Sequence, residues 1–377
     1  MERCKTTPRS DWQTKVESLG FIFHTPGGNP YWDESTYYKL STHDVEVLEK
    51  ATAELYQLYL EAGDYILRKN LFHRLQIPPS VVPLIREAWE NEPFCLNYGR
   101  FDLGYDGKSP PKLYEFNCDT PTCLLEAAVI QWQWKEELFP SLDQFNSLHE
   151  KLVAKWKDIG SLSHDVHFMH VADPVAEDMM TVSYMRDVAE AAGQHTVPLF
   201  AEQVGWDKLY KKFVDMDNNQ IHMMFHLYPW EWMVREEFGS HIKDSGVTWV
   251  EPIWKMMWSN KAVLPVLHMM FPDHPNLLPS HTLPVGKTYI KKPILGREGR
   301  NVQIVEDDVV TFKSDGEYGE EGFAYQELHK PELFDGMQPV IGSWVVDGEP
   351  AGIGIREAIA PGVTDNGSLF VPHVIGT

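Results

Sequence analysis

The chain has 377 residues, of which 43% are hydrophobic and 12% aromatic, a composition that supports a large buried core and excludes a disordered chain. Acidic residues number 55 against 33 lysines and arginines, and the net charge of −22 argues against a nucleic-acid partner, whose phosphates require basic surfaces. The four cysteines form no Cys-x-x-Cys motif, and the apolar runs are too short for a signal peptide or a membrane span, so we expect a cytoplasmic protein with reduced thiols.

Helical and strand patterns mix along the whole chain. Apolar residues at helical spacing predict helices over 42–68, 79–91, 123–138 and 177–193. Two β-rich runs around the turn at Asp106-Gly107 predict a hairpin, and short apolar runs predict buried strands after Asp165 and before Pro229. Residues 258–271 begin as a helix, and from Lys287 onward the chain is rich in strands and glycine. This mixture predicts an α/β or α+β protein with several sheets.

The predicted hairpin carries polar residues at alternate positions. In a strand, side chains two residues apart share a face, so Arg100 lies beside Asp102 and Glu115 beside Asn117. When the strands pair, these four groups gather on one face, and the large apolar groups gather on the other. Two carboxylates and a carboxamide suit Mg²⁺, and an adjacent arginine suits a phosphate or a carboxylate. The alternative is a solvent-facing strand surface with a salt bridge.

A glycine-rich segment follows a second β-type run. The run ends at Lys291-Lys292-Pro293, and Gly296 and Gly299 follow on either side of Arg297 and Glu298. Flexible glycines allow backbone amides to approach a phosphate, and a lysine of the preceding strand can reach it. The segment matches neither a Walker A loop nor a Gly-x-Gly-x-x-Gly fingerprint. It predicts either a mobile lid over a nucleotide or a basic β-turn.

Three further segments are weak signals by themselves. The strand "FAYQEL" offers Gln326, Glu327 and Leu328 to a base and ribose. The Gly-interrupted strand "AGIGIREAIAPG" brings Arg356 where small neighbours permit close approach. The segment "SNKAVLPVL" places Lys261 one turn into a helix.

Taken together, these segments resemble the synthetase part of the glutathionylspermidine synthase family and its shorter bacterial acid–amine ligase members. The stretches that carry the resemblance are "YGRFDLGYDG", "LYEFNCDTPT", "YPWEWM", "SNKAVLPVL" and "KKPILGREGRNV". The resemblance implies an ATP-grasp fold with a pre-ATP-grasp domain. The hairpin precedes Lys261 and Lys292 in this chain, an order similar to the circularly permuted arrangement of the family.

The resemblance also implies an organisation and roles for individual residues. It suggests a helical region with the Mg²⁺-binding hairpin over 1–160, a pre-ATP-grasp-like substrate domain over 161–260 and a nucleotide-binding region with a lid over 261–377. The implied metal ligands are Asp102, Glu115 and Asn117, and the implied arginines around the phosphoryl group are Arg100, Arg297 and Arg356. The implied nucleotide residues are Lys261, Lys292, Gly296, Gly299, Gln326, Glu327 and Leu328. The implied substrate residues are Thr120 for the acid and Glu177 with Asp178 for the amine, and the choice of Lys292 over Lys291 follows the Lys-Pro match.

The function expected from this resemblance is an ATP- and Mg²⁺-dependent ligase that joins an acid to an amine. The acid would be a peptide or an amino-acid-like molecule and the amine a polyamine or another cationic amine. We expect no amidase domain, because no Cys-nucleophile region of that size precedes the synthetase segment. Two alternatives stay open: an ATP-grasp small-molecule kinase, and a catalytically silent nucleotide-binding protein.

Overall fold

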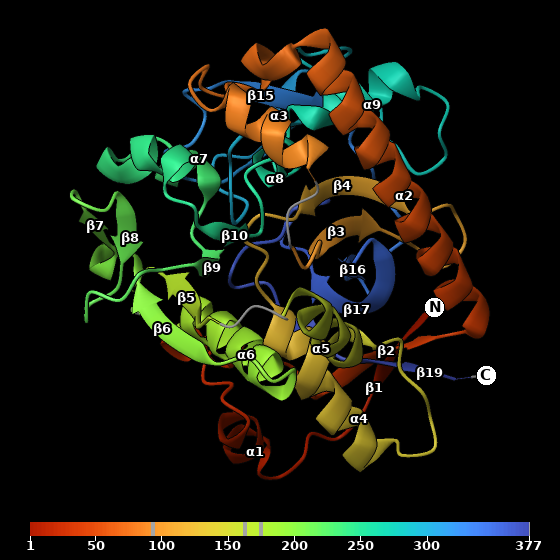
Figure 1. Cartoon of the computed structure of the whole chain (residues 1–377). Coiled ribbons are helices and arrows are strands. Elements are labelled where there is room, and N and C mark those ends of the chain that lie inside the picture. The colour runs from red at the N-terminus through yellow and green to blue at the C-terminus, as the bar shows by residue number, and fades with distance from the viewer. Residues whose placement is uncertain (92–94, 161–163, 173–175, 377) are drawn as a thin grey trace.

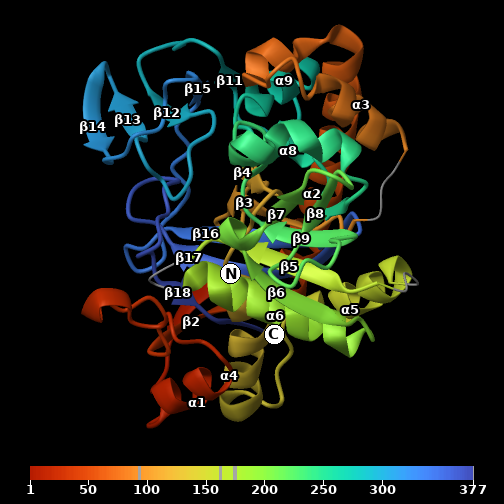
Figure 2. The same ribbon diagram turned by 60° about the vertical axis from the view of Figure 1, so that its left-hand side comes forward.

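β-Sheets form the framework of the molecule, and the strands of the predicted hairpin belong to the central one (Figures 1 and 2). The computed structural model describes residues 1–91, 95–160, 164–172 and 176–376. Across these residues it shows a mixed α/β fold with several sheets, as expected from the sequence. Within the same ranges, each helix falls short of the length or the apolar character that crossing a bilayer demands.

The central sheet joins segments that are far apart in the chain. In spatial order it contains β18 (Phe370–Val371), β17 (Glu349–Glu357), β16 (Pro339–Val346), β3 (Gly99–Gly104) and β4 (Lys112–Asn117). All neighbouring strands are antiparallel, and β16 lies between the hairpin β3–β4 and the strand that carries Arg356. The hairpin predicted from the Asp106-Gly107 turn is confirmed. The three-segment division remains a prediction, and this sheet combines strands of the first and third segments.

Helices cover both faces of the central sheet. Helix α2 (Thr42–Lys69) packs on one face, where its buried side chains meet those of Phe101, Phe116 and Ile341 (Figure 1). A π-helical turn (Glu126–Ile130), α4 (Gln131–Leu138) and α5 (Leu148–Ile159) belong to a second core on the other face. The 28 residues of α2 begin at a capping box formed by Ser41 and Asp44, which satisfies amides at its first turn.

A parallel sheet lies next to the second core. Its order is β10 (Thr248–Val250), β9 (Met223–Leu227), β5 (Val166–His170) and β6 (Thr196–Phe200), and α6 (Glu177–Ala191) packs against it. The predicted strands after Asp165 and before Pro229 are therefore confirmed as β5 and β9. Ligands of open α/β sheets bind at the carboxyl ends of parallel strands. Here those ends, at Val171 and Tyr228, line a cavity described below.

The third sheet is antiparallel and projects from the rest of the molecule at the upper left of Figure 2. Its order is β11 (Ser280–His281), β15 (Phe323–Gln326), β12 (Tyr289–Pro293), β13 (Gln303–Glu306) and β14 (Val309–Lys313). It contains Lys291 and Lys292, and the glycine-rich segment connects β12 with β13. The strand-rich character predicted after Lys287 is confirmed.

The remaining elements are short. The strands are β1 (Glu2–Lys5), β2 (Thr36–Leu40), β7 (Gly205–Asp207), β8 (Lys212–Val214) and β19 (His373–Ile375). The α-helices are α1 (Trp12–Ser18), α3 (Val82–Glu90), α7 (Trp230–Met233), α8 (Lys255–Trp258) and α9 (Val263–Met270), and the 3₁₀ turns are Pro26–Gly28, Leu71–Leu75, Ala201–Gln203 and Glu237–Asp244. The helices predicted over 42–68, 79–91, 123–138 and 177–193 are all present, with ends that differ by a few residues.

Candidate functional site

The hairpin places its four predicted polar residues on one face of the central sheet. Strands β3 and β4 pair so that Arg100 lies opposite Asn117 and Asp102 lies opposite Glu115. The Asn117 amide donates hydrogen bonds to Asp102 Oδ2 at 3.2 Å and to Glu115 Oε1 at 3.3 Å. The shared face predicted from residue spacing is thus confirmed. We call these four residues the hairpin cluster.

The opposite face of the hairpin differs from the prediction in one residue. The large apolar groups expected there were Phe101, Leu103, Tyr114 and Phe116. Phe101 and Phe116 do stack, with ring centroids 3.8 Å apart. A bulge in the ladder, however, pairs Leu103 with Leu113, so Tyr114 leaves this core and lines a cavity instead. A bulge changes the side of the sheet that the following residues face, which spacing alone does not reveal.

Two arginines hold the carboxylate of Asp102. Arg100 Nε donates to Asp102 Oδ1 at 2.7 Å, and Arg356 Nη2 donates to Asp102 Oδ2 at 3.0 Å. Arg100 reaches this position by lying across Gly342 of β16, where an added Cβ would be 2.7 Å from Arg100 Cδ. The small residue opposite Asp102 therefore leaves space for the arginine. Arg356 comes from β17, the predicted Gly-interrupted strand.

Two lysines bring ammonium groups to the same cluster. Lys261 Nζ lies 3.1 Å from Glu115 Oε2, and Lys292 Nζ donates to the Tyr114 carbonyl at 3.1 Å and to Gln326 Oε1 at 2.9 Å. Burial raises the pKa of Glu115, but the two ammonium groups outweigh burial and lower this pKa to about 2. Burial lowers the pKa of Lys292 to about 8, although Glu115 opposes the shift. Strongly perturbed groups in a cavity are typical of functional sites.

The position of Lys261 corrects a prediction. It was expected one turn into a helix, but α8 ends at Trp258 and α9 begins at Val263, so Lys261 lies in the turn between them. Pro265 supplies the reason, because it has no N–H to bond to the Lys261 carbonyl four residues earlier. The turn directs the Lys261 backbone N–H to the Ile294 carbonyl at 2.9 Å.

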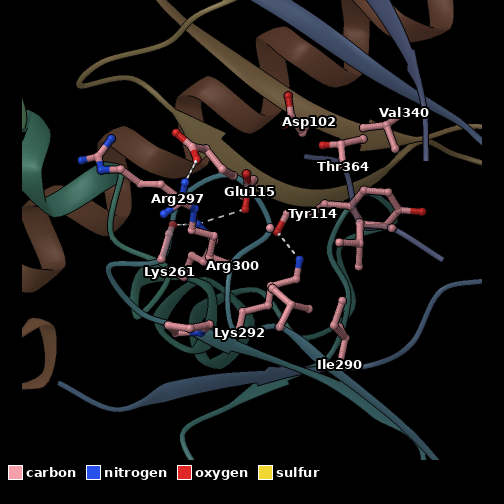
Figure 3. Close-up of a pocket in the computed structure, with 17 residues that line it drawn as sticks. Asp102, Tyr114, Glu115, Lys261, Ile290, Lys292, Arg297, Arg300, Val340 and Thr364 are labelled. Atoms are coloured by element: carbon pink, nitrogen blue, oxygen red, sulfur yellow. Dashed lines mark hydrogen bonds and ion pairs between the residues drawn. The ribbon is translucent and has the colours of Figure 1, made fainter. Parts of the chain in front are cut away.

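Strand alternation separates the two adjacent lysines of β12. Lys291 Nζ lies over the ring of Phe323, 3.8 Å from its centroid. The side chain of Lys292 enters the cavity and is 3% exposed (Figure 3). The geometry therefore agrees with the choice of Lys292 over Lys291, and its role toward a nucleotide stays a prediction.

The segment between β12 and β13, residues 294–302, crosses the hairpin cluster, and we call it the glycine loop. Lys261 Nζ donates to the Gly296 carbonyl at 2.6 Å. Gly299 has a φ of 64°, and an added Cβ would lie 2.7 Å from the Thr364 carbonyl oxygen. Both the left-handed backbone and the close contact require glycine at this position. These contacts show that the loop is docked in the structure, and its mobility stays a prediction.

Two neighbouring cavities meet at the glycine loop. The first has a volume of about 40 Å³ and the second about 400 Å³. Predicted site residues that line the first cavity are Asp102, Glu115, Lys261, Lys292, Gly296, Arg297 and Gly299 (Figure 3). Predicted site residues that line the second are Arg100, Glu115, Asn117, Thr120, Glu177, Asp178, Arg297, Gly299 and Arg356. The fold thus brings together residues from all three predicted segments.

The three residues predicted for the base and ribose lie at the edge of this arrangement. Gln326 is buried beside Lys292, to which its side-chain oxygen is bonded. Leu328 packs against the apolar group that contains Ile290 of the first cavity. The side chain of Glu327 is exposed and lines neither cavity.

The predicted acidic pair begins helix α6 and faces the second cavity. Glu177 is 9% exposed, and burial together with the nearby Glu126 carboxylate raises its pKa to about 7, although a hydrogen bond with Thr122 opposes this. Asp178 follows it in the first turn of the helix. A carboxylate that is costly to ionise in place is stabilised by an incoming cation. The geometry can therefore accept an ammonium group.

The hairpin cluster also fits a divalent cation by its donor set. The Asn117 amide nitrogen lies within hydrogen-bonding distance of one carboxylate oxygen of Asp102 and one of Glu115, so the three side chains converge on one point. Oxygen ligands of this kind suit Mg²⁺, which retains waters and shares phosphate oxygens. The Asn117 amide nitrogen faces the carboxylates here, and a rotation of the amide would present its oxygen to a metal.

Four residues near the cavities were missed by reasoning from the sequence. Tyr114 and Thr364 line the first cavity. Asp119 and Glu231 lie beside the glycine loop at Arg297. Arg297 donates to Thr120 Oγ1 and to Glu231 Oε1, both at 2.6 Å. A signal existed for Glu231, because it is an acid within the aromatic stretch "YPWEWM" that carries part of the family resemblance.

Comparison with known proteins decides the family. A family model described as "Glutathionylspermidine synthase preATP-grasp" matches residues 3–376. The chain belongs to the glutathionylspermidine synthase family. The resemblance inferred from the motifs is therefore confirmed over nearly the full length of the chain.

Two curated members of the family show how far the similarity extends. A Haemophilus influenzae protein named "Putative acid--amine ligase" is 38% identical over 97% of each chain. The "Bifunctional glutathionylspermidine synthetase/amidase" of Escherichia coli is 28% identical over 86% of this chain, which spans 57% of that longer protein. The chain thus matches one family member end to end and little more than half of the other.

A solved structure gives an independent view of the fold. A glutathione synthetase-like effector from Globodera pallida superposes with a TM-score of 0.59 over 99% of this chain and 98% of the effector, at 11% identity. At this identity the likeness concerns the fold alone. The expected fold class, mixed α/β of the ATP-grasp type with a pre-ATP-grasp part, is confirmed by this likeness and by the family.

Proposed function

We propose that this protein is an ATP-dependent acid–amine ligase that forms an amide through an acyl phosphate. The observation that carries the proposal is the meeting of the hairpin cluster with Lys261 and Lys292 where two cavities adjoin. The first cavity is rich in groups that bind phosphate, and the second combines arginines with a carboxylate pair. Membership of a synthetase family supports the same conclusion.

The proposed reaction has two steps. A carboxylate oxygen of the acid attacks the γ-phosphorus of ATP, the bond from that phosphorus to the bridging oxygen breaks, and ADP leaves. The neutral amine then attacks the acyl carbon, phosphate leaves, and the nitrogen loses its proton to form the amide. Positioning and charge neutralisation supply most of the catalysis in phosphoryl transfer, so little acid–base work by side chains is needed.

The residues of the first cavity would bind and orient the nucleotide. Lys261 and Lys292 hold phosphate oxygens, and the glycine loop excludes water from the acyl phosphate. Asp102, Glu115 and Asn117 would hold a Mg²⁺ ion, which would supply positive charge to neutralise the phosphates. The apolar wall that includes Leu328, together with the polar end of β15, would receive the base and ribose.

The residues of the second cavity would hold the two other substrates. Arg100 and Arg356 neutralise the carboxylate of the acid and the phosphoryl group that it accepts. Thr120 would donate to the acid, and Glu177 with Asp178 would hold the ammonium form of the amine. The names of the relatives suggest glutathione-like peptides as acids and polyamines as amines.

The kinase alternative differs in its demand for an amine. A kinase would release ADP with an acceptor alone, whereas the ligase needs acid and amine together for sustained turnover. A silent nucleotide-binding protein would release no ADP with any pair. The carboxylate pair that lines the second cavity favours the ligase, because the ligase reaction requires an amine and a kinase reaction does not.

The test is an ADP-release screen with Mg²⁺. Thiol tripeptides and other peptides would be combined with polyamines and amino acids, and products would be identified by the mass of the new amide. We expect ADP release that depends on both substrates and on Mg²⁺. Release without an amine would replace the ligase by the kinase, and binding of nucleotide without turnover on any pair would favour the silent protein.

A further inference from the structure

The glycine loop is fastened to the far side of the site by one arginine. Arg297 extends from the loop to Thr120 Oγ1 and Glu231 Oε1, both at 2.6 Å, and its Nη2 lies 3.9 Å from Asp119 Oδ2. Thr120 and Asp119 directly follow the hairpin, and Glu231 belongs to α7. One guanidinium thus joins the loop to two elements outside the nucleotide sheet.

The two acids that receive Arg297 are buried. Asp119 is 1% exposed and Glu231 is 6% exposed. Asp119 Oδ2 also accepts the Trp230 backbone N–H at 3.0 Å, which fixes α7 beside it. Two neighbouring carboxylates in such a place are costly unless a cation stays between them.

The loop position has a consequence for access to the first cavity. That cavity has a volume of about 40 Å³, and the glycine loop forms part of its wall from Gly296 to Arg300. Small-molecule sites usually measure about 300–1,000 Å³. A cavity of this size does not hold a nucleotide, so nucleotide binding requires the glycine loop to move, and Arg297 moves with it. Entry requires that the contacts of Arg297 break or rearrange.

We propose that Glu231 and Asp119 are positioning residues that lock Arg297 and hold the glycine loop closed until a phosphate takes the guanidinium. The inference rests on the nucleotide site proposed above and goes beyond it, because it assigns a role to two acids outside that site. Arg297, Glu231, Asp119 and Thr120 together form the Arg297 lock.

The lock works by competition for one cation. A guanidinium binds carboxylate and phosphate with the same N–H groups, and Glu231 and Thr120 hold Nη2 and Nη1 of Arg297, so a phosphate that is to be bound by these two groups must displace Glu231 and Thr120. When the closed state is favoured, the apparent affinity for a nucleotide falls by the fraction of molecules that are open. Removing the charge of Glu231 or Asp119 should therefore strengthen nucleotide binding, whereas damage to the fold should weaken it.

The first measurement is hydrogen–deuterium exchange without nucleotide. Glu231→Gln removes the charge 2.6 Å from the guanidinium, and Asp119→Asn removes the charge 3.9 Å away. We expect residues 294–302 to exchange about tenfold faster in Glu231→Gln, and less so in Asp119→Asn, because the nearer charge contributes more. Unchanged exchange of this segment in both variants would overturn the proposal.

The chain offers a matched control for the lock. Arg235, close to α7, pairs with Glu321 near the start of β15 at 3.2 Å. This ion pair joins the same two parts of the molecule, but it is half-exposed and does not touch the glycine loop. Arg235→Gln should leave exchange at residues 294–302 as in the wild type. An equal acceleration in the control would show that general loosening, and not the lock, governs the loop, and would overturn the proposal.

The second measurement is the affinity for β,γ-imido-ATP with Mg²⁺. We expect Glu231→Gln to bind it more tightly than the wild type, by about tenfold if the closed state prevails. Weaker binding would contradict the lock. If no variant binds the analogue but the loop exchanges faster in Glu231→Gln, the contacts of Arg297 do hold the loop. That result would still refute the proposed nucleotide site, and with it the release of Arg297 by a phosphate. Should Glu231→Gln fail to fold, Asp119→Asn carries both measurements.

Discussion

Two lysine–carboxylate pairs lie close to the hairpin β3–β4, one bonded to Tyr98 just before β3 and the other including Glu115 of β4, and they differ in what covers them. Lys255 Nζ lies 3.0 Å from Glu251 Oε2, and these side chains are 0% and 1% exposed. Lys261 Nζ lies 3.1 Å from Glu115 Oε2, and these side chains are 10% and 26% exposed. The two distances are nearly equal. Ion-pair geometry alone therefore does not distinguish a structural pair from one in a site.

The surroundings make the distinction. The rings of Trp254 and Trp258 lie within 5.6 Å of the Lys255 ammonium, and the amides of Leu96 and Asn97 donate to Glu251. Every bond of this pair is to the protein itself. The Lys261 pair instead opens onto two cavities. A sealed pair stabilises the fold, whereas an open pair can exchange its partner for a ligand.

The largest expected effect concerns the sealed pair. Lys255→Met leaves Glu251 as a buried charge without a cation, so we expect the free energy of unfolding to fall by about 3–5 kcal/mol. Lys261→Met, at the open pair, should cost only about 1 kcal/mol because water screens Glu115. Urea unfolding monitored by tryptophan fluorescence measures both. Adding Glu251→Gln to Lys255→Met should restore part of the loss, and equal losses at the two lysines would erase the distinction.

The next effect concerns turnover at the open pair. Glu115→Gln keeps the shape of the side chain but removes a charge from the proposed metal site, so ATP turnover at limiting Mg²⁺ should fall by about 100- to 1,000-fold. The unfolding midpoint should stay near that of the wild type. Initial rates of ADP release across a Mg²⁺ titration provide the measurement. Glu306→Gln, at a surface pair with Lys330, is the control, and equal rates in the two variants would remove Glu115 from the site.

A smaller effect is expected at the acidic pair of α6. Glu177→Gln with Asp178→Asn should raise the amine KM by about 30-fold, equal to about 2 kcal/mol, and leave the KM for ATP nearly unchanged. Because Glu177 has a pKa raised to about 7, it loses its charge as the pH falls through 7, and the amine KM of the wild type should rise in that direction. The double variant should lack this rise. A purely structural role at the helix start would lower stability by about 1 kcal/mol and leave the amine KM unaltered.

The smallest effect separates the neighbouring lysines of β12. Lys292→Met removes the ammonium that enters the first cavity, so the Kd of β,γ-imido-ATP should rise by about tenfold. Lys291→Met removes the ammonium that covers Phe323 and should leave the Kd unchanged. Isothermal titration calorimetry on both variants checks this pair. Equal affinities would mean that the first cavity does not bind the nucleotide phosphates.

Much of the fold could be predicted from periodicity. The 28-residue helix α2 and the hairpin β3–β4 follow from apolar spacing and from a turn with Asp106-Gly107. Local patterns are informative here because the period of the side chains follows directly from the backbone geometry. The errors arose at Tyr114 and Lys261, where a bulge and Pro265 interrupt that period.

The sequence predicted the types of residue in the candidate site, but it identified only some of the residues that belong to it. Arg100, Asp102, Glu115 and Asn117 were found because a short hairpin places them together without help from the rest of the chain. Asp119 and Glu231 were not found, because they come together only when α7 docks beside the hairpin. Long-range docking leaves no periodic signal in either segment.

By itself, the sequence determined the elements, the polar face of the hairpin and the family to which the chain belongs. The tertiary structure decided which lysine is sealed and which is open, since Lys255 and Lys261 are six residues apart and carry the same charge. The physical reason is burial. The energy of a charge depends on whether water, protein or a cavity surrounds it, and that environment is assembled from segments distant in the chain.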